Sequence, residues 1–152
     1  MGNGFRAFVF SASFFVCTLG LYVPVSADSH ERPNVLVLHS YHKGLSWVDD
    51  QTAGIVQTFN GEGLDVMFHV EYMDWKFNPT QENLRLRYEQ YKLRYAGMRI
   101  DLVLTTDDAA LSFALRHRAE LFPDAPLVFN GVLRDSAKRL TAGHANLTGV
   151  YE

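Results

Sequence analysis

The chain has 152 residues, of which 20% are charged, and its formal net charge at pH 7 is −3. A single cysteine cannot form an intramolecular disulfide, and no run of lysine and arginine is long enough for nucleic-acid binding. These features exclude a disulfide-stapled scaffold and a nucleic-acid-binding protein.

The first 27 residues have the pattern of a secretory signal peptide. One positive charge, Arg6, precedes an uncharged run from Ala7 to Val23, and small residues follow where a signal peptidase cleaves. We expect cleavage after Ala27, which leaves residues 28–152 as a mature domain in the periplasm or another extracytoplasmic space. The alternative is an uncleaved leader that anchors the protein in the inner membrane. In that case the leader is its only contact with the membrane.

From Asn34 onward, short apolar runs alternate with amphipathic segments. Runs rich in Val and Leu, bounded by Gly, Pro and polar residues, predict strands that are buried on both faces. The predicted strands are 34–39, 64–72, 100–105, 126–130 and 146–152. The helices predicted between them are 46–61, 79–96, 107–122 and 135–140. This alternation indicates an α/β fold, a Rossmann-like open parallel sheet of about five strands with helices on both faces.

Residues that favour helix ends mark where the predicted helices begin. Ser46 is expected to cap the first helix, with Asp49 as its capping-box partner. Pro79 is expected at the first position of the second helix. Either Asp107 or Asp108 is expected to cap the third helix.

Polar and aromatic residues follow each of the first four predicted strands. In open parallel sheets, ligands bind beyond the carboxyl ends of the strands, so these residues are the candidates for a ligand-binding site. The candidates are Ser40, Tyr41, His42 and Trp47 after the first strand, Asp74 after the second, Thr106, Asp107 and Asp108 after the third, and Asn130 and Gly131 after the fourth. Aromatic rings and hydrogen-bonding groups at these places favour a small organic ligand.

Motifs for other chemistry are missing. The first strand-to-helix turn has neither GxGxxG nor GxxxxGK[ST], so we expect no nucleotide cofactor. His39 and His42 are three residues apart, and Asp74, Asp107 and Asp108 could add oxygen ligands. No HExxH or Cys/His pattern is present, so we expect no metal, and His39 is interpreted as a hydrogen-bonded structural residue. Ser40 lies outside a GxSxG motif, so we expect no catalytic residue. An enzyme would require His42, Asp74 and one of the two adjacent aspartates to converge.

Two segments resemble the ABC-type solute-binding protein family, which also occurs as the extracytoplasmic sensor domain of bacterial histidine kinases. The segments are VLVLHSYHKGLSWVDDQTAGI (35–55) and DLVLTTDDAALSFALRHRAELFPDAPLVFNGV (101–132). The resemblance implies a type 1 periplasmic-binding-protein fold, in which two Rossmann-like lobes close on a small molecule that contacts the strand tips. It extends over residues 34–152 and corresponds to the N-terminal lobe, so we expect the second lobe in a longer protein.

The expected function is therefore binding of a small organic solute outside the cytoplasm, without catalysis. The resemblance implies either the substrate-binding component of an ABC transporter, with a permease as partner, or a sensor domain that is fused to or partnered with a histidine kinase. Two alternatives stay open. One is a small exported hydrolase-like enzyme that uses His and Asp at the strand tips. The other is a lobe that binds a partner chain through its exposed last strand.

Overall fold

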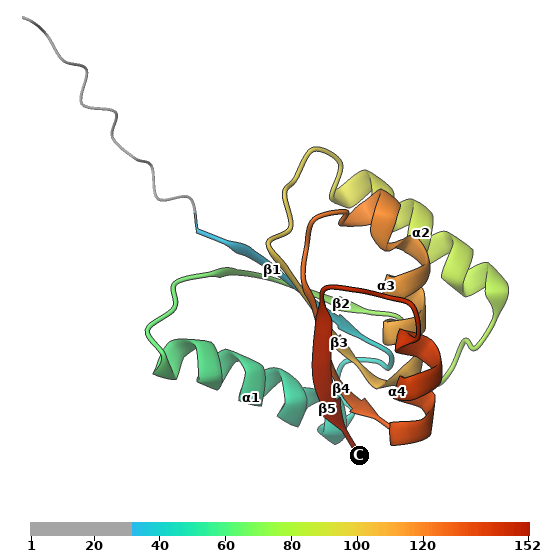
Figure 1. The fold of residues 1–152 in the computed structure, drawn as a ribbon, viewed down its shortest axis with the longest axis horizontal. Helices are drawn as coiled ribbons and strands as arrows, with labels where there is room; N and C mark the ends of the chain where they lie inside the picture. Colours follow the sequence, from blue (N-terminus) through green and yellow to red (C-terminus); the bar gives the residue numbers. More distant parts are fainter. Residues whose placement is uncertain (1–31) are drawn as a thin grey trace, which may run out of the picture. The chain divides into compact units, whose positions relative to one another are not determined.

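The computed structural model describes residues 32–152, in which strands and helices alternate along the chain (Figure 1). The strands are β1 (Asn34–His39), β2 (Met67–Tyr72), β3 (Leu102–Thr106), β4 (Leu127–Val132) and β5 (Leu147–Tyr151). The helices are α1 (Ser46–Gly61), α2 (Gln81–Arg94), α3 (Asp107–Leu121) and α4 (Arg134–Thr141). The predicted leader, residues 1–27, lies outside the described residues. Within residues 32–152, no helix combines the length and the apolar character that crossing a bilayer requires.

The five strands of residues 32–152 form one parallel sheet in the order β2-β1-β3-β4-β5. α1 lies on one side of this sheet, and α2, α3 and α4 lie on the other (Figure 1). The predicted Rossmann-like α/β fold is therefore confirmed. β2 and β3 flank β1 on opposite sides, so the strand order reverses between β1 and β3. Open parallel sheets bind ligands at such a reversal, beyond the carboxyl ends of the strands.

β2 is shorter than predicted. It begins at Met67 rather than at Leu64, because the backbone N–H of Leu64 donates to the carbonyl of Phe59 at 2.9 Å and so closes the turn that follows α1. The bounds of the other four strands agree with the prediction to within two residues.

The predicted start of α2 is also wrong. The helix begins at Gln81 rather than at Pro79, because Thr80 is its N-cap. The Thr80 hydroxyl accepts a hydrogen bond from the backbone N–H of Asn83 at 3.1 Å. The threonine side chain satisfies one of the free amides at the helix start, and Pro79 lies one position before the N-cap.

The capping box predicted for α1 does not form. Ser46 is the first helical residue, and Leu45 occupies the N-cap without a side-chain hydrogen bond. Asp49 instead accepts a hydrogen bond from the backbone N–H of Gly44 at 3.1 Å, one position before the N-cap. The aspartate therefore holds the turn that leads into α1, and the serine hydroxyl has no capping role.

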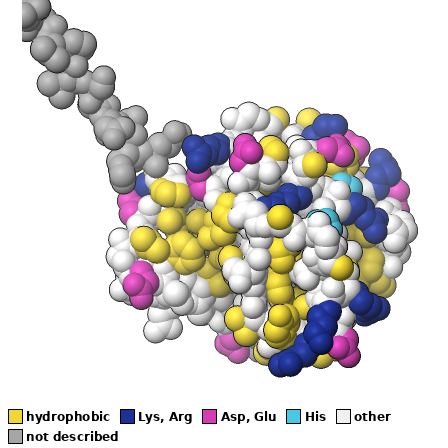
Figure 2. All heavy atoms as spheres, viewed as in Figure 1, with side chains coloured by type: hydrophobic (Ala, Val, Ile, Leu, Met, Phe, Trp, Pro, Cys, Tyr) yellow, Lys and Arg dark blue, Asp and Glu magenta, His cyan; other side chains and the backbone are white. Residues whose placement is uncertain are grey.

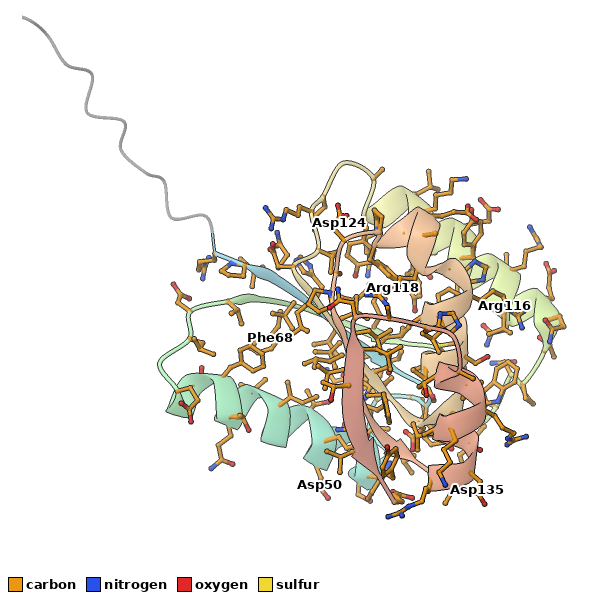
Figure 3. All side chains as sticks on the ribbon, viewed as in Figure 1. Asp50, Phe68, Arg116, Arg118, Asp124 and Asp135 are labelled. Atoms are coloured by element: carbon orange, nitrogen blue, oxygen red, sulfur yellow. The ribbon has the colours of Figure 1, made fainter. Side chains whose placement is uncertain are left out.

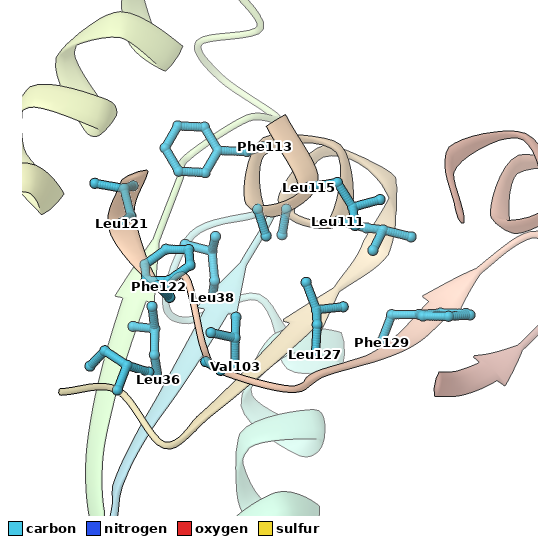
Figure 4. Packing of buried hydrophobic residues seen from close by; sticks show 14 of the residues in the cluster. Leu36, Leu38, Val103, Leu111, Phe113, Leu115, Leu121, Phe122, Leu127 and Phe129 are labelled. Carbon is cyan, nitrogen blue, oxygen red and sulfur yellow. The ribbon is translucent and has the colours of Figure 1, made fainter. Parts of the chain in front are cut away.

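The main hydrophobic core lies between the sheet and the layer formed by α2, α3 and α4 (Figure 4). Its large buried side chains include Leu36, Leu38, Tyr91, Val103, Leu111, Phe113, Leu121, Phe122, Leu127 and Phe129. At the margin of the core, the buried carboxylate of Glu71 accepts a hydrogen bond from the Tyr95 hydroxyl at 2.7 Å and pairs with Arg94. Arg118, labelled in Figure 3, donates to the carbonyls of Ala145 and Asn146 and so ties α3 to the segment before β5.

The opposite face of the sheet carries α1 and no other helix of residues 32–152 (Figure 1). Phe59 of α1 packs edge-on against Phe68 of β2, with ring centroids 5.2 Å apart, and Phe68 is labelled in Figure 3. Beside α1, an apolar groove of about 500 Å³ remains open over β3, β4 and β5. Figure 2 shows hydrophobic side chains exposed between α1 and the sheet.

Candidate functional site

Ser40, at the tip of β1, joins this strand to the start of α3. The serine is fully buried; its hydroxyl donates to the carbonyl of Thr106 at 2.7 Å and accepts from the backbone N–H of Ala110 at 2.8 Å. Ser40 therefore caps α3, and the prediction that Asp107 or Asp108 caps it is wrong. Because the hydroxyl already makes both bonds, Ser40 positions the strand tip rather than meeting a ligand.

His39 forms the buried base of the site. The Thr52 hydroxyl donates its only hydrogen to the carbonyl of Val48 at 2.8 Å, so Nε2 of His39 must be the donor toward that hydroxyl at 2.9 Å. Nδ1 then accepts from the hydroxyl of Thr106 at 3.0 Å. Burial lowers the pKa of His39 to about 4, although Asp49 opposes this effect. His39 is therefore neutral at pH 7 and fully hydrogen-bonded, as its structural interpretation predicted.

Asp107 places a carboxylate where the strand order reverses. Its backbone φ is +65°, a left-handed conformation that Asp tolerates better than most residues but that still carries strain. The residue is only 8% exposed. Oδ1 accepts a hydrogen bond from the indole N–H of Trp47 at 3.2 Å, whereas Oδ2 is buried without any partner. A buried carboxylate oxygen without a donor is costly, so its presence calls for a functional explanation.

Gly131 brings the tip of β4 against this carboxylate. Its φ is +65°, and a Cβ atom there would lie 3.1 Å from Oδ1 of Asp107 and 3.0 Å from Nε2 of Gln51. The register of β4 against β5 shifts at the same point, as expected for a bulge. Gln51 also makes a long contact of 3.5 Å with Oδ1 of Asn130, and its own Oε1 is buried without a partner. Asp107 and Gln51, each with one unpartnered oxygen, thus both border Gly131.

The charged groups that shift the pKa of Asp107 are both negative. Burial raises the pKa of Asp107 to about 6, the indole N–H of Trp47 and the hydroxyl of Thr106 oppose this rise, and the charges of Glu152 and Asp108 add to it. The pKa of Tyr41 is raised by burial and by the same three carboxylates, so its hydroxyl lies within their field. No lysine or arginine is among the groups that shift these two pKa values. No salt bridge within residues 32–152 involves any of the three carboxylates.

His42 and Asp74 belong to the β2 side of the edge. The ring of His42 packs against Phe77, with centroids 4.4 Å apart, and its Nδ1 is buried without a partner. Asp74 has a φ of +57°, and its carboxylate accepts from the side-chain amide of Asn78 at 2.8 Å, which fixes the turn before α2. No group of three or more His, Cys, Asp or Glu side chains in the described part of the chain is arranged to hold a metal ion.

The structure thus divides the predicted site residues into three sets. Those gathered around the reversal point are Tyr41, Trp47, Asp107, Asp108, Asn130 and Gly131. Ser40 and Thr106 are buried beneath them, and His42 and Asp74 lie toward β2. Asp108 is exposed and shares an open cavity of about 400 Å³ with Trp75 and residues of α4.

Two residues of this edge were not predicted from the sequence. Glu152 directly follows β5, so the rule that selected the other strand tips also applies to it. Gln51 lies within α1 and has no motif around it, and only its packing against Gly131 identifies it.

Comparisons of the chain with protein-family models, with curated proteins and with solved structures found no match in any of the three. The resemblance to solute-binding proteins therefore stays a prediction, and it rests on the two sequence segments that carry it.

Proposed function

We propose that the domain binds a small organic solute outside the cytoplasm, at the carboxyl edge of its sheet. It would serve as the solute-binding component of an ABC transporter or as the ligand-sensing domain of a signalling receptor. One observation carries the proposal: the buried, unpartnered Oδ2 of Asp107 lies at the point where the strand order reverses. A ligand that donates a hydrogen bond there would satisfy an oxygen that no donor in residues 32–152 satisfies.

The aromatic groups at the same edge also support binding. Trp47 is 45% exposed, although its indole N–H is fixed by Asp107. An indole ring held in place and open to solvent offers contact area to a ligand at little entropic cost. Tyr41, half-buried beside the carboxylates, adds a second ring.

The chemistry of the site favours binding over catalysis. The Ser40 hydroxyl donates to the carbonyl of Thr106 and accepts from the N–H of Ala110, so it is not free to act as a nucleophile. The ring of His39 is neutral and has both nitrogens engaged, so it is not available as a general base. His42 and Asp74 contact the loop after β2 rather than Asp107.

The two tryptophans provide a direct test. In the ¹⁵N-labelled full chain, Trp47 and Trp75 each give one indole N–H resonance, and Trp75→Phe assigns them. The probe is the small-molecule fraction of an extract of the source cells, with the same fraction from unrelated cells as control. A shift confined to the Trp47 resonance is expected. If the Trp47 resonance does not move, solute binding at this edge is wrong.

A second candidate function is pairing of two copies through the edge strand β5. Val150 and Tyr151 of this strand are 69% and 48% exposed, and the strand borders the apolar groove beside α1. Uncovered edge strands pair readily with another chain. Sedimentation of the full chain over a range of concentrations tests this function: it predicts a dimer that Val150→Lys dissociates, and a monomer at every concentration would exclude it.

A further inference from the structure

The strand-tip edge carries three carboxylates that form no salt bridge within residues 32–152. We call the carboxylates of Asp107, Asp108 and Glu152 the acidic edge. Many lysine and arginine side chains lie over α2, α3 and α4, and others lie at the strand-tip end of the molecule (Figure 2). Arg116 and Arg118, labelled in Figure 3, belong to α3. Arg134 lies over the ring of Tyr151, 5.5 Å from its centroid and next to Glu152 in the chain. Arg139 lines the same open cavity as Asp108. No hydrogen bond or salt bridge within residues 32–152 joins a lysine or arginine to Asp107, so this carboxylate in particular lacks a positive partner.

We propose that the solute bound at the acidic edge is an organic cation, whose ammonium or guanidinium N–H donates to Oδ2 of Asp107. This assignment rests on the function proposed above and narrows it to one class of ligand. Asp107 is more than nine-tenths buried, and its other oxygen, Oδ1, accepts a hydrogen bond from the indole N–H of Trp47 at 3.2 Å. The carboxylate is thus fixed in direction, with one oxygen left for one donor.

A charged donor suits this oxygen better than a neutral one. Hydrogen bonds between a carboxylate and a cation are roughly twice as strong as neutral ones, and they gain further where water is excluded. The ring of Trp47 lies beside the same carboxylate, so a cation there would also contact the face or edge of an indole. Asp108 and Glu152 would add attraction at longer range.

Metal ions and anions fit this place poorly. A metal ion needs several ligands that converge, and no such group exists among the described residues. An anion would be drawn to the start of α3, but Ser40 already caps that end, and Asp107 and Asp108 stand in its first turn. Repulsion from the acidic edge would exclude a further negative charge.

Matched pairs of probes test the assignment on the full chain. The pairs are methylammonium and methanol, phenethylammonium and phenethyl alcohol, and putrescine and butanediol. Each pair differs in charge and hardly in shape. The cation of at least one pair is expected to shift the Trp47 indole resonance, while its alcohol does not. The proposal would be overturned if, in all three pairs, the cation and its alcohol have the same effect on this resonance or neither has any effect.

A variant locates the effect at one oxygen. Asp107→Asn keeps the shape of the side chain, and Asn tolerates the left-handed backbone, so this variant is expected to fold. It should weaken binding of the active cation by at least about tenfold. Asp50→Asn, on an exposed aspartate of α1 labelled in Figure 3, is the charge-matched control and should bind like the original chain. Equal affinity for Asp107→Asn and the original chain would overturn the proposal.

The assignment and the proposed function fail in different ways. If the extract fraction shifts the Trp47 indole resonance but no ammonium probe shifts it, the proposal of a solute site stands and the ligand is not a cation. If the extract fraction also leaves Trp47 unmoved, both are wrong.

Discussion

The hydroxyl of Ser40 accepts a hydrogen bond from the backbone N–H of Ala110 at 2.8 Å, across 70 residues of sequence. Helix caps usually come from the residue just before the helix, whereas this one comes from the tip of the neighbouring strand. The bond fixes β1 and α3 against each other at the point where the strand order reverses. Tyr41 directly follows Ser40, and Asp107 is the first residue of α3, so the same contact fixes where these two residues lie relative to each other.

The first prediction concerns this cap. Ser40→Ala removes a buried hydroxyl and leaves the amide of Ala110 without a partner, so the free energy of unfolding should fall by about 1–2 kcal/mol. Ser46→Ala is the control, because Ser46 is exposed and caps nothing, and its effect should stay within about 0.5 kcal/mol. Urea unfolding of both variants measures the difference. Equal losses, or a larger loss for Ser46→Ala, would contradict the cap.

The second prediction is that Asp107→Asn stabilises the free protein at neutral pH. Since the folded-state pKa is raised from 3.8 to about 6, the buried carboxylate costs about 3 kcal/mol above pH 6. This cost disappears as the pH falls from 6 toward 4, because the folded protein then takes up the proton more readily than the unfolded chain. The variant should therefore be more stable than the original chain at pH 7 and differ little from it at pH 4. Thermal unfolding at the two pH values measures this, and a destabilised variant at pH 7 would refute it.

The third prediction separates crowding from backbone strain at Gly131. Gly131→Ala forces alanine into a left-handed conformation and brings its Cβ within 3.1 Å of Asp107 and 3.0 Å of Gln51. Gly143→Ala has a similar φ of +79° with nothing within 4 Å, so it carries the strain alone, about 1–2 kcal/mol. Chemical denaturation should show a larger loss for Gly131→Ala. If the two variants lose the same stability, the tip of β4 does not press on Asp107.

The fourth prediction follows from His39. Its folded-state pKa of about 4 lies below the ordinary value of 6.5, so the unfolded chain binds the proton first as the pH falls. The stability that neutral His39 provides is complete above pH 6.5 and declines between pH 6.5 and pH 4, by up to about 3 kcal/mol. Titration of the His39 ring protons by NMR should give a midpoint near 4. A midpoint near 6.5 would mean that the buried network with Thr52 and Thr106 is absent.

Much of the fold followed from local pattern. The alternation of apolar runs and amphipathic segments predicted every strand and helix of residues 32–152, because burial on both faces and helical periodicity are properties of short segments. The rule that ligands meet strand tips then selected Trp47, Asp107 and Gly131, which do lie together.

The caps and the charge balance did not follow in the same way. Ser46 and Asp49 matched a capping box, yet the cap that matters comes from Ser40 and depends on the packing of β1 against β3. The left-handed backbone of Asp107 and its single unpartnered oxygen are likewise set by tertiary contacts. These features depend on residues far apart in the chain, so no short segment of the sequence predicts them.

The most direct test of the account is the ionisation of Asp107 in the free, full-length chain. The side-chain carboxyl ¹³C chemical shift of Asp107, recorded as a function of pH, gives the pKa of this residue. The Asp107→Asn variant assigns the signal. We expect the Asp107 carboxyl to titrate near pH 6, because it is buried, lies near the negative charges of Asp108 and Glu152, and forms no salt bridge. A midpoint at or below the ordinary value of 3.8 would mean that the charge is already compensated, and the acidic edge would then have no place for a ligand.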